Sequence, residues 1–269
     1  MWIAHFAPGL ALKRMAPDIP LAFLALAGAL PDALFMVFAM LGRSLHILFD
    51  LKIDHRHIGI ETIKYSDKSE DWLYRNPTGG RGSGCFPYDC DYPYTHSVTG
   101  EIVISLVFAA LITVYAGSKR WQSFVALVLA GLTHPILDLA VHRHDVALTP
   151  SEPPSQRHGF PLFDYPILTF VVDLGIFLGA LYYHLSTARV KGTQEHRVQT
   201  ARVYIYAAIA ATLIQADFAF FGAPTTFARA LHAPLFLGQI LAISWGCGLL
   251  DVASEGAGGL EKAKAGKAL

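Results

Sequence analysis

Long apolar stretches separated by polar segments run through the whole chain. A helix needs about 20 largely apolar residues to cross a bilayer. Six stretches reach or approach that length, at residues 19–41, 98–116, 121–141, 162–185, 203–221 and 234–250. A further stretch at residues 3–15 is too short to cross and is expected to form an N-terminal half-helix. The pattern predicts an all-α fold, a polytopic membrane helix bundle of six spans plus this half-helix.

The polar segments define the domain organisation. Residues 43–94 are polar and irregular, so we expect an extramembrane loop inserted between spans one and two. Residues 251–269 are rich in glycine, alanine and lysine and are expected to form a disordered tail. Residues 1–250 then make up a single integral membrane domain.

Composition agrees with a membrane protein. The chain is 53% hydrophobic and only 16% charged, whereas soluble domains carry roughly 25% charged residues. Its net charge is zero, so no general attraction to nucleic acid is expected, and membrane lipids are the expected surroundings.

Lysine and arginine in the short loops predict the orientation in the membrane. One side carries most of them: Lys13, Arg14, Lys119, Arg120, Arg189, Lys191, Arg197, Arg202, Lys262, Lys264 and Lys267. The short loops of the other side carry only Arg143, Arg157 and Arg229. By the positive-inside rule the first side is cytoplasmic. The loop at residues 43–94 and the mouth of span three then face the non-cytoplasmic side.

The end of span three carries the main candidate chemistry. His134 and Asp138 are four residues apart, so on a helix they share one face about 6 Å apart along the axis. Two metal ligands can have this spacing. His142 lies about 12 Å beyond His134, and we expect it, with His144 and Asp145, to belong to a solvated loop. Two structural alternatives stay open: His134 bonded to a backbone carbonyl, and Asp138 paired with Arg143.

Other polar residues fall near the same depth. His96 precedes span two, and Asp32 lies in the non-cytoplasmic half of span one. If the half-helix turns back at residues 16–18, His5 comes within roughly 5 Å of the depth of Asp32. The side chains expected to meet are His5, Asp32, His96, His134 and Asp138. Imidazoles with carboxylates are typical ligands of divalent ions, with zinc expected and manganese or iron as alternatives.

Three of these residues also have a simpler interpretation. His96 could cap the helix of span two at the membrane interface. His5 could lie on a free surface at the N-terminus. Asp32 follows Pro31 and could satisfy backbone groups freed at a kink.

Four short motifs resemble a known family. They are His5 in Ile-Ala-His-Phe-Ala-Pro-Gly, Pro31-Asp32, Tyr94-Thr-His-Ser97 and Thr133-His-Pro-Ile-Leu-Asp138. Their order within a multispan chain resembles the YdjM-like membrane-bound metal-dependent hydrolases of bacteria, over about residues 1–185. Many members carry His-Arg before the Thr-His-Ser element, where this chain has Tyr92-Pro93. The resemblance implies a membrane-embedded hydrolase that depends on a metal ion.

Such a hydrolase needs further groups. Asp173 or Glu101 could accept the proton of a metal-bound water. Arg143 could hold a phosphate or carboxylate at the mouth. A lipid or another phosphoester at the non-cytoplasmic membrane face is the expected substrate.

Two other functions stay open. Asp32, Asp173 and Asp217 on separate spans could form a path for protons or metal ions in a transporter or channel. A non-catalytic membrane scaffold could keep a structural metal site. Depth separates these functions, because a hydrolytic site gathers at one mouth, whereas a transport path extends through both leaflets.

Overall fold

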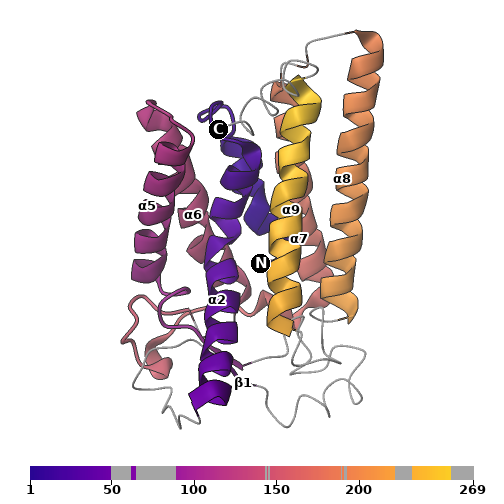
Figure 1. Cartoon of the computed structure of the whole chain (residues 1–269). Helices are drawn as coiled ribbons and strands as arrows, with labels where there is room; N and C mark the ends of the chain where they lie inside the picture. The colour runs from indigo at the N-terminus through magenta and orange to yellow at the C-terminus, as the bar shows by residue number, and fades with distance from the viewer. Residues whose placement is uncertain are drawn as a thin grey trace.

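The protein is a bundle of long helices with a short N-terminal segment inside it (Figure 1). We describe a computed structural model, which covers residues 1–49, 62–64, 89–142, 144, 146–188, 190, 193–221 and 232–255; of these, residues 42–49, 62–64, 89–91, 154, 232 and 255 are described by their backbone alone. The predicted tail beyond residue 255 and most of the predicted loop at residues 43–94 lie outside these ranges.

Six helices are long and apolar enough to cross a membrane, which confirms the predicted fold class. They are α2 (Leu21–Phe49), α5 (Val98–Tyr115), α6 (Trp121–Val141), α7 (Pro166–Thr187), α8 (Gln194–Phe221) and α9 (His232–Glu255). Short elements are η1 (Ile3–Phe6), α1 (Ala7–Leu12), β1 (Thr62–Lys64), β2 (Asp89–Asp91), η2 (Pro154–Gln156) and η3 (Leu162–Asp164). β1 and β2 pair antiparallel.

Helix ends differ from the prediction by four or more residues at four places. Helix α8 begins at Gln194, nine residues before the predicted span at residues 203–221. Helix α2 continues to Phe49, into the predicted loop, and α9 continues to Glu255, five residues into the predicted tail. Helix α7 begins at Pro166 because residues 162–164 form the separate 3-10 turn η3. Proline is favourable in the first turn of a helix, where its missing N–H is not needed.

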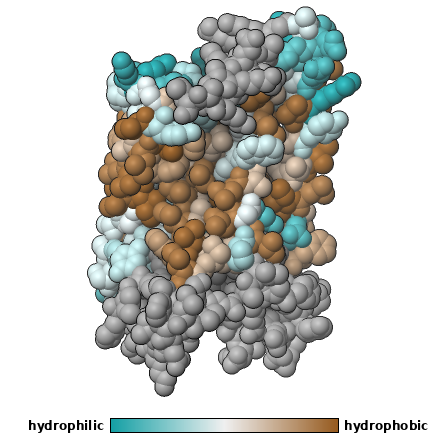
Figure 2. Space-filling model, viewed as in Figure 1, coloured by the Kyte–Doolittle hydropathy of each residue, from teal (hydrophilic) through white to brown (hydrophobic). Residues whose placement is uncertain are grey.

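The outer surface of the bundle is apolar. Figure 2 shows a broad belt of hydrophobic side chains on the viewed face, with hydrophilic residues beyond it at the upper end. Large side chains such as Val114, Ile167 and Tyr182 are more than two-thirds exposed, at 81%, 73% and 74%. A soluble protein rarely exposes so much apolar surface in one patch, so the six helices indicate an integral membrane protein.

The N-terminal half-helix lies inside the bundle, not on a free surface. Elements η1 and α1 pack against α2, α6 and α7, and seven of their ten residues are buried. Two glycines allow this close approach. A Cβ on Gly9 would lie 2.4 Å from the backbone nitrogen of Ala25, and one on Gly28 would lie 2.0 Å from the carbonyl oxygen of His5.

Asp173 of α7 anchors the start of this segment. Its Oδ2 accepts a hydrogen bond from the backbone N–H of Trp2 at 2.7 Å, and its Oδ1 accepts one from Ala4 at 2.6 Å. The first N–H groups of a helix have no partner within it. Irregular backbone at membrane depth is tolerated only where protein satisfies it, and Asp173 provides that here.

Ionic contacts hold the turn after α1, which lies at the other end of the N-terminal segment from Asp173. The Lys13 ammonium lies 2.6 Å from Asp251 of α9 and donates to the carbonyl of Ile19 at 2.7 Å. Asp18 accepts a hydrogen bond from Ser123 at the start of α6, at 2.6 Å. Partial burial would raise the pKa of Asp18, but hydrogen bonds from Ser118 and Ser123 hold this pKa below its ordinary value. These contacts fix the half-helix antiparallel to α2.

Candidate metal centre

The side chains predicted to converge meet in the interior of the bundle. His134 and Asp138 come from α6, Asp32 from α2, His5 from η1, and His96 from the turn before α5. The side chains of His5, His96, His134 and Asp138 are at most 4% exposed, and that of Asp32 is 18% exposed. The convergence expected from depth along the spans is therefore confirmed.

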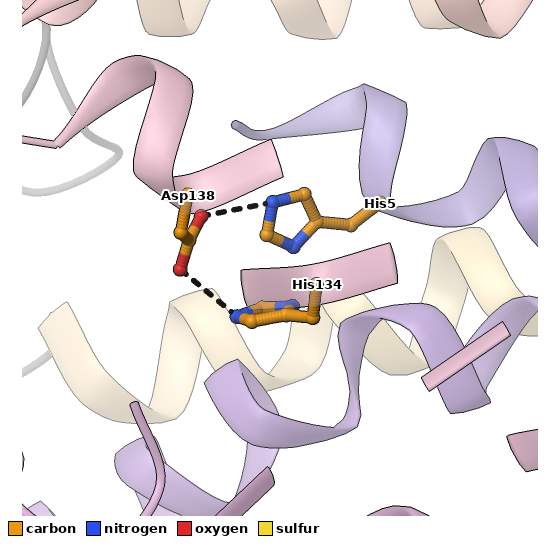
Figure 3. A group of neighbouring side chains, drawn as sticks. All are labelled: His5, His134 and Asp138. Carbon is orange, nitrogen blue, oxygen red and sulfur yellow. Dashed lines mark ion pairs between the residues drawn. The ribbon is translucent and has the colours of Figure 1, made fainter. Parts of the chain in front are cut away.

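Asp138 lies at the centre of the cluster. Its Oδ1 is 3.1 Å from Nε2 of His5, and its Oδ2 is 3.1 Å from Nε2 of His134, as Figure 3 shows. Nε2 of His96 is 3.8 Å from the same Oδ2. The amino group of Met1 also lies 2.9 Å from Oδ1.

Asp32 faces the cluster from the opposing helix. Its Oδ1 lies 3.1 Å from Nε2 of His96 and 3.9 Å from Nε2 of His134. Its Oδ2 lies 3.4 Å from Nδ1 of His5. Three histidines are thus enclosed by two carboxylates from different helices.

These distances suit a shared divalent ion. Four ligands at about 2.0–2.2 Å from a tetrahedral ion lie roughly 3.3–3.6 Å from one another, and the donor separations above scatter around that value. Two triads have all their donor atoms within 4.8 Å: His5 with His134 and Asp138, and Asp32 with His96 and His134.

Several of the donor atoms have no ordinary hydrogen bond. Among the described residues, both ring nitrogens of His5, Nε2 of His134 and Oδ2 of Asp138 are buried without a hydrogen-bond partner. Their nearest partners are one another's carboxylate oxygens and ring nitrogens at 3.1–3.4 Å, and a buried polar atom without a hydrogen bond costs up to about 1–3 kcal/mol. A cation bound by Asp138, His134 and one ring nitrogen of His5 would remove most of that cost, so the residues present fit a metal ion.

The orientation of the imidazoles supports the same interpretation. Nδ1 of His134 bonds the carbonyl of Gly28 at 2.8 Å, and Nδ1 of His96 bonds the hydroxyl of Thr95 at 2.8 Å. Each ring therefore directs Nε2 at the carboxylates. Metal-binding histidines characteristically donate their second ring N–H to such a partner. The carbonyl bond considered as an alternative for His134 is present, and it leaves Nε2 facing the cluster.

Because Nε2 of His134 belongs to both triads, the geometry bears on the number of ions. A neutral imidazole whose Nδ1 donates a proton has one lone pair, on Nε2. One lone pair binds one ion, so His134 could complete only one of the two triads at a time, and an ion shared by both triads would satisfy them together.

The capping role considered for His96 belongs to its neighbour. Ser97 is the N-cap of α5, and its hydroxyl accepts from the backbone N–H of Gly100 at 3.3 Å. His96 is therefore free of that role.

His142 lies at the cluster, contrary to the expectation of a solvated loop. It is 8% exposed, and its Nε2 lies 3.6 Å from Oδ2 of Asp138. Nδ1 of His142 lies 2.9 Å from the Tyr92 hydroxyl. The sequence signal was the second four-residue step, from Asp138 to His142, which repeats the step from His134 to Asp138. His144, which is exposed, agrees with the expectation.

The groups predicted to assist hydrolysis lie in different surroundings. Both oxygens of Asp173 accept backbone N–H groups, so this residue anchors the N-terminal segment, and its role as a proton acceptor stays a prediction. Glu101, in the first turn of α5, is fully buried, and its carboxyl oxygens have no hydrogen-bond partner among the described residues. Arg143 and its predicted pairing with Asp138 lie outside the described residues, as does Asp145.

A small cavity of about 30 Å³ opens beside the cluster. Asp32, His96 and His142 line it, whereas His5, His134 and Glu101 do not. A cavity of this size can hold a water molecule or a small substrate group. The cluster is therefore approached from the side of Asp32, His96 and His142.

The acid considered for a transport path is not part of the cluster. Asp217 is an exposed residue near the end of α8. Of the three acids proposed for such a path, only Asp32 belongs to the centre.

Comparisons with known proteins give no relative: no protein-family model, curated protein or solved structure matches this chain.

Proposed function

We propose that this integral membrane protein binds one divalent metal ion at the cluster and uses it for hydrolysis. The observation that carries the proposal is the arrangement of His96 and His134. In each, Nδ1 is held by a protein group while Nε2 faces buried carboxylates. Zinc is the expected ion because it favours imidazole with carboxylate, and manganese and iron are the alternatives.

The residues of the cluster and its cavity would have separate roles in binding the ion and in hydrolysis. His5, Asp32, His96, His134 and Asp138 would hold the ion, and the two aspartates would neutralise its charge. A bound divalent ion supplies hydroxide at neutral pH by lowering the pKa of a bound water to about 7. The cavity beside Asp32 and His96 admits the water and the reacting group of the substrate. Of the two acids predicted to accept a proton, Glu101 is the favoured one, because its oxygens have no hydrogen-bond partner among the described residues whereas both oxygens of Asp173 do.

A lipid or another phosphoester is the proposed substrate class. The resemblance to the YdjM-like hydrolases supports hydrolysis, and the burial of the centre within a membrane bundle supports a substrate drawn from membrane lipids. The distribution of charges in the short loops supports a mouth on the non-cytoplasmic side.

Metal content tests the binding half of the proposal. The detergent-purified protein should contain about one zinc, manganese or iron ion per chain by elemental analysis. His134→Ala and Asp138→Asn should lose it. His144→Ala is the matched control, because His144 is an exposed histidine close in sequence, and it should keep the ion. Equal metal content in all four proteins would refute the site.

Hydrolysis is tested separately on the metal-loaded protein. Phosphoesters and lipid esters should be cleaved by wild type and His144→Ala but not by Asp138→Asn. If metal is bound stoichiometrically, no ester is cleaved, and vesicles containing the protein take up the ion, the transporter function would replace hydrolysis.

A further inference from the structure

The cavity beside the metal centre is walled by aromatic side chains from six different parts of the chain. We call them the aromatic collar: Trp2, Phe35, Tyr92, Phe163, Phe218 and Phe236. Phe35 comes from α2, Phe163 from η3, Phe218 from α8 and Phe236 from α9, while Trp2 precedes η1 and Tyr92 precedes α5. Each is at most 6% exposed.

The rings of the collar touch one another in sequence around the cavity. Phe35 lies 5.5 Å from Tyr92, Phe163 lies 5.6 Å from Phe218, and Trp2 lies 6.1 Å from Phe218 and 4.5 Å from Phe236, measured between ring centroids. His142 completes the series, 5.9 Å from Tyr92 and 5.4 Å from Phe163. Edge and offset contacts of this kind make a firm apolar wall.

The polar side of the same cavity is the metal centre. Asp32, His96 and His142 are its ionisable side chains, and all three belong to or contact the cluster. A molecule in this cavity would therefore have one end at the ion and the rest against aromatic rings. Apolar walls with a few polar groups at one end are characteristic of sites that bind small molecules.

We propose that the aromatic collar is the specificity filter of the centre and receives an unbranched apolar chain. The substrate is then an amphiphile whose polar group meets the ion and whose adjoining methylene groups lie among the rings. This inference rests on the proposed function, because the ion fixes the position of the polar group.

Charge and position favour a hydrocarbon chain over a cationic headgroup. Aromatic rings can hold ammonium groups, but one divalent ion together with the Met1 amino group, 2.9 Å from Asp138, would more than balance the charges of Asp32 and Asp138. No net negative charge is then left to attract a second cation. The helix segments that supply Phe218 and Phe236 also expose Phe221 and Leu235, which are 75% and 47% exposed. The bilayer, a source of such chains, thus lies on the outer face of the same helices.

Alkyl hydroxamates of increasing length test the collar directly, because the hydroxamate group chelates divalent ions. The probes are acetohydroxamate and its unbranched four-, six- and eight-carbon homologues, titrated into the full-length cobalt-loaded protein. Binding is followed by the visible absorption of the cobalt ion. Affinity should rise about fourfold for each methylene group that becomes buried, until the collar is full. A branched probe and one ending in a trimethylammonium group should bind more weakly than the straight chain of equal length.

Two phenylalanines near the end of α8 give a matched pair of variants. Phe218→Ala enlarges the collar and should shift the optimum to longer chains, with Phe218→Leu giving a smaller shift if the alanine variant fails to fold. Phe221→Ala alters an exposed ring and should leave the chain-length profile unchanged. All variants are compared in the same detergent, so that partition of the probes into micelles cancels.

The outcomes separate this inference from the function on which it rests. Affinity that is independent of chain length, with the cobalt spectrum still responding to acetohydroxamate, would overturn the collar and leave the metal centre standing. A stronger response to the trimethylammonium probe would replace the chain by a cationic headgroup. Failure to bind cobalt at all would overturn both the metal centre and the collar.

Discussion

Two threonines that each precede a histidine of the cluster give the sharpest test of the metal centre. The hydroxyl of Thr95 bonds Nδ1 of His96 at 2.8 Å. The hydroxyl of Thr133 instead donates to the carbonyl of Ala130 in its own helix, at 2.6 Å. Thr95→Val and Thr133→Val are nearly isosteric, and each changes the threonine of a Thr-His pair. Only Thr95→Val removes a hydrogen-bond partner of a proposed metal ligand. We therefore expect Thr95→Val alone to weaken metal binding.

The expected size follows from the role of such partners. Removing a group that orients a metal-bound histidine typically lowers affinity about 10–100-fold. A tenfold change is about 1.4 kcal/mol, so the metal-dependent stabilisation should fall by about 1.4–2.7 kcal/mol when the ion is in excess. For a chain of this size that corresponds to a smaller rise in melting temperature on metal addition, by about 3–10 °C.

The assay compares each protein with itself. Melting temperature is measured with a chelator and then with excess zinc, so any effect of the substitution on the metal-free protein cancels in the difference. Competition with a zinc-binding dye gives the affinity independently. If Thr95→Val and Thr133→Val show the same metal-dependent shift as wild type, Nε2 of His96 does not bind the ion and the reasoning from ring orientation fails.

Three further substitutions test the surroundings of the centre. Gly28→Ala places a Cβ 2.0 Å from the carbonyl oxygen of His5, so the half-helix must shift; thermal melting should show a loss of about 1–3 kcal/mol, and elemental analysis a reduced metal content. Asp173→Asn replaces a carboxylate that accepts two backbone N–H groups, and about 1.5–3 kcal/mol should be lost, with faster hydrogen exchange in residues 1–12 by mass spectrometry. Glu101→Gln removes a buried carboxyl with no hydrogen-bond partner among the described residues. The free energy of unfolding from thermal melting should therefore change by less than about 1 kcal/mol, and metal content should stay at the wild-type level. Loss of the ion would make Glu101 a ligand.

Periodicity and depth were sufficient to predict the bundle and the convergence of its polar residues. A helix rises a fixed distance per residue, so counting residues from a span end places His134, Asp138 and Asp32 in one layer without any knowledge of packing. His5 needed the additional assumption of a reversed half-helix. The structure supplies the reason that the reversal is stable: Gly9 and Gly28 allow the two backbones to touch, and Lys13 holds the turn.

Counting residues along the helix axis failed for His142 because it assumed that the helix continues through His142. It also measured the distance from His142 to His134 instead of the distance to Asp138. His142 is the C-cap of α6, with an extended backbone (ψ 149°), and its contact is with Asp138 rather than with the more distant His134. The hydrogen-bond partners of Asp173 could not be predicted from the sequence either. An acid within an apolar span signals a buried partner, but sequence alone does not say whether that partner is a metal ion or backbone N–H groups 169 and 171 residues away.

Where the polar groups lie bears on the choice between hydrolysis and transport. At the opposite end of the bundle, Lys13 pairs with Asp251, and Nδ1 of His184 bonds the Tyr204 hydroxyl at 2.6 Å. Between that end and the cluster the chain places Leu10 on α1, Leu24 on α2 and Leu127 on α6, each at most 1% exposed and part of one continuous core. A conducting path needs polar or hydrated groups at every level, whereas α1, α2 and α6 carry buried leucines toward the far end, and the buried face of α5 changes from Glu101 and Ser105 to Ala109. Within the described residues the centre therefore opens to its cavity on one side and meets packed hydrocarbon beyond Glu101 and Ser105 on the other. This arrangement favours the proposed reaction at one membrane face over passage through both.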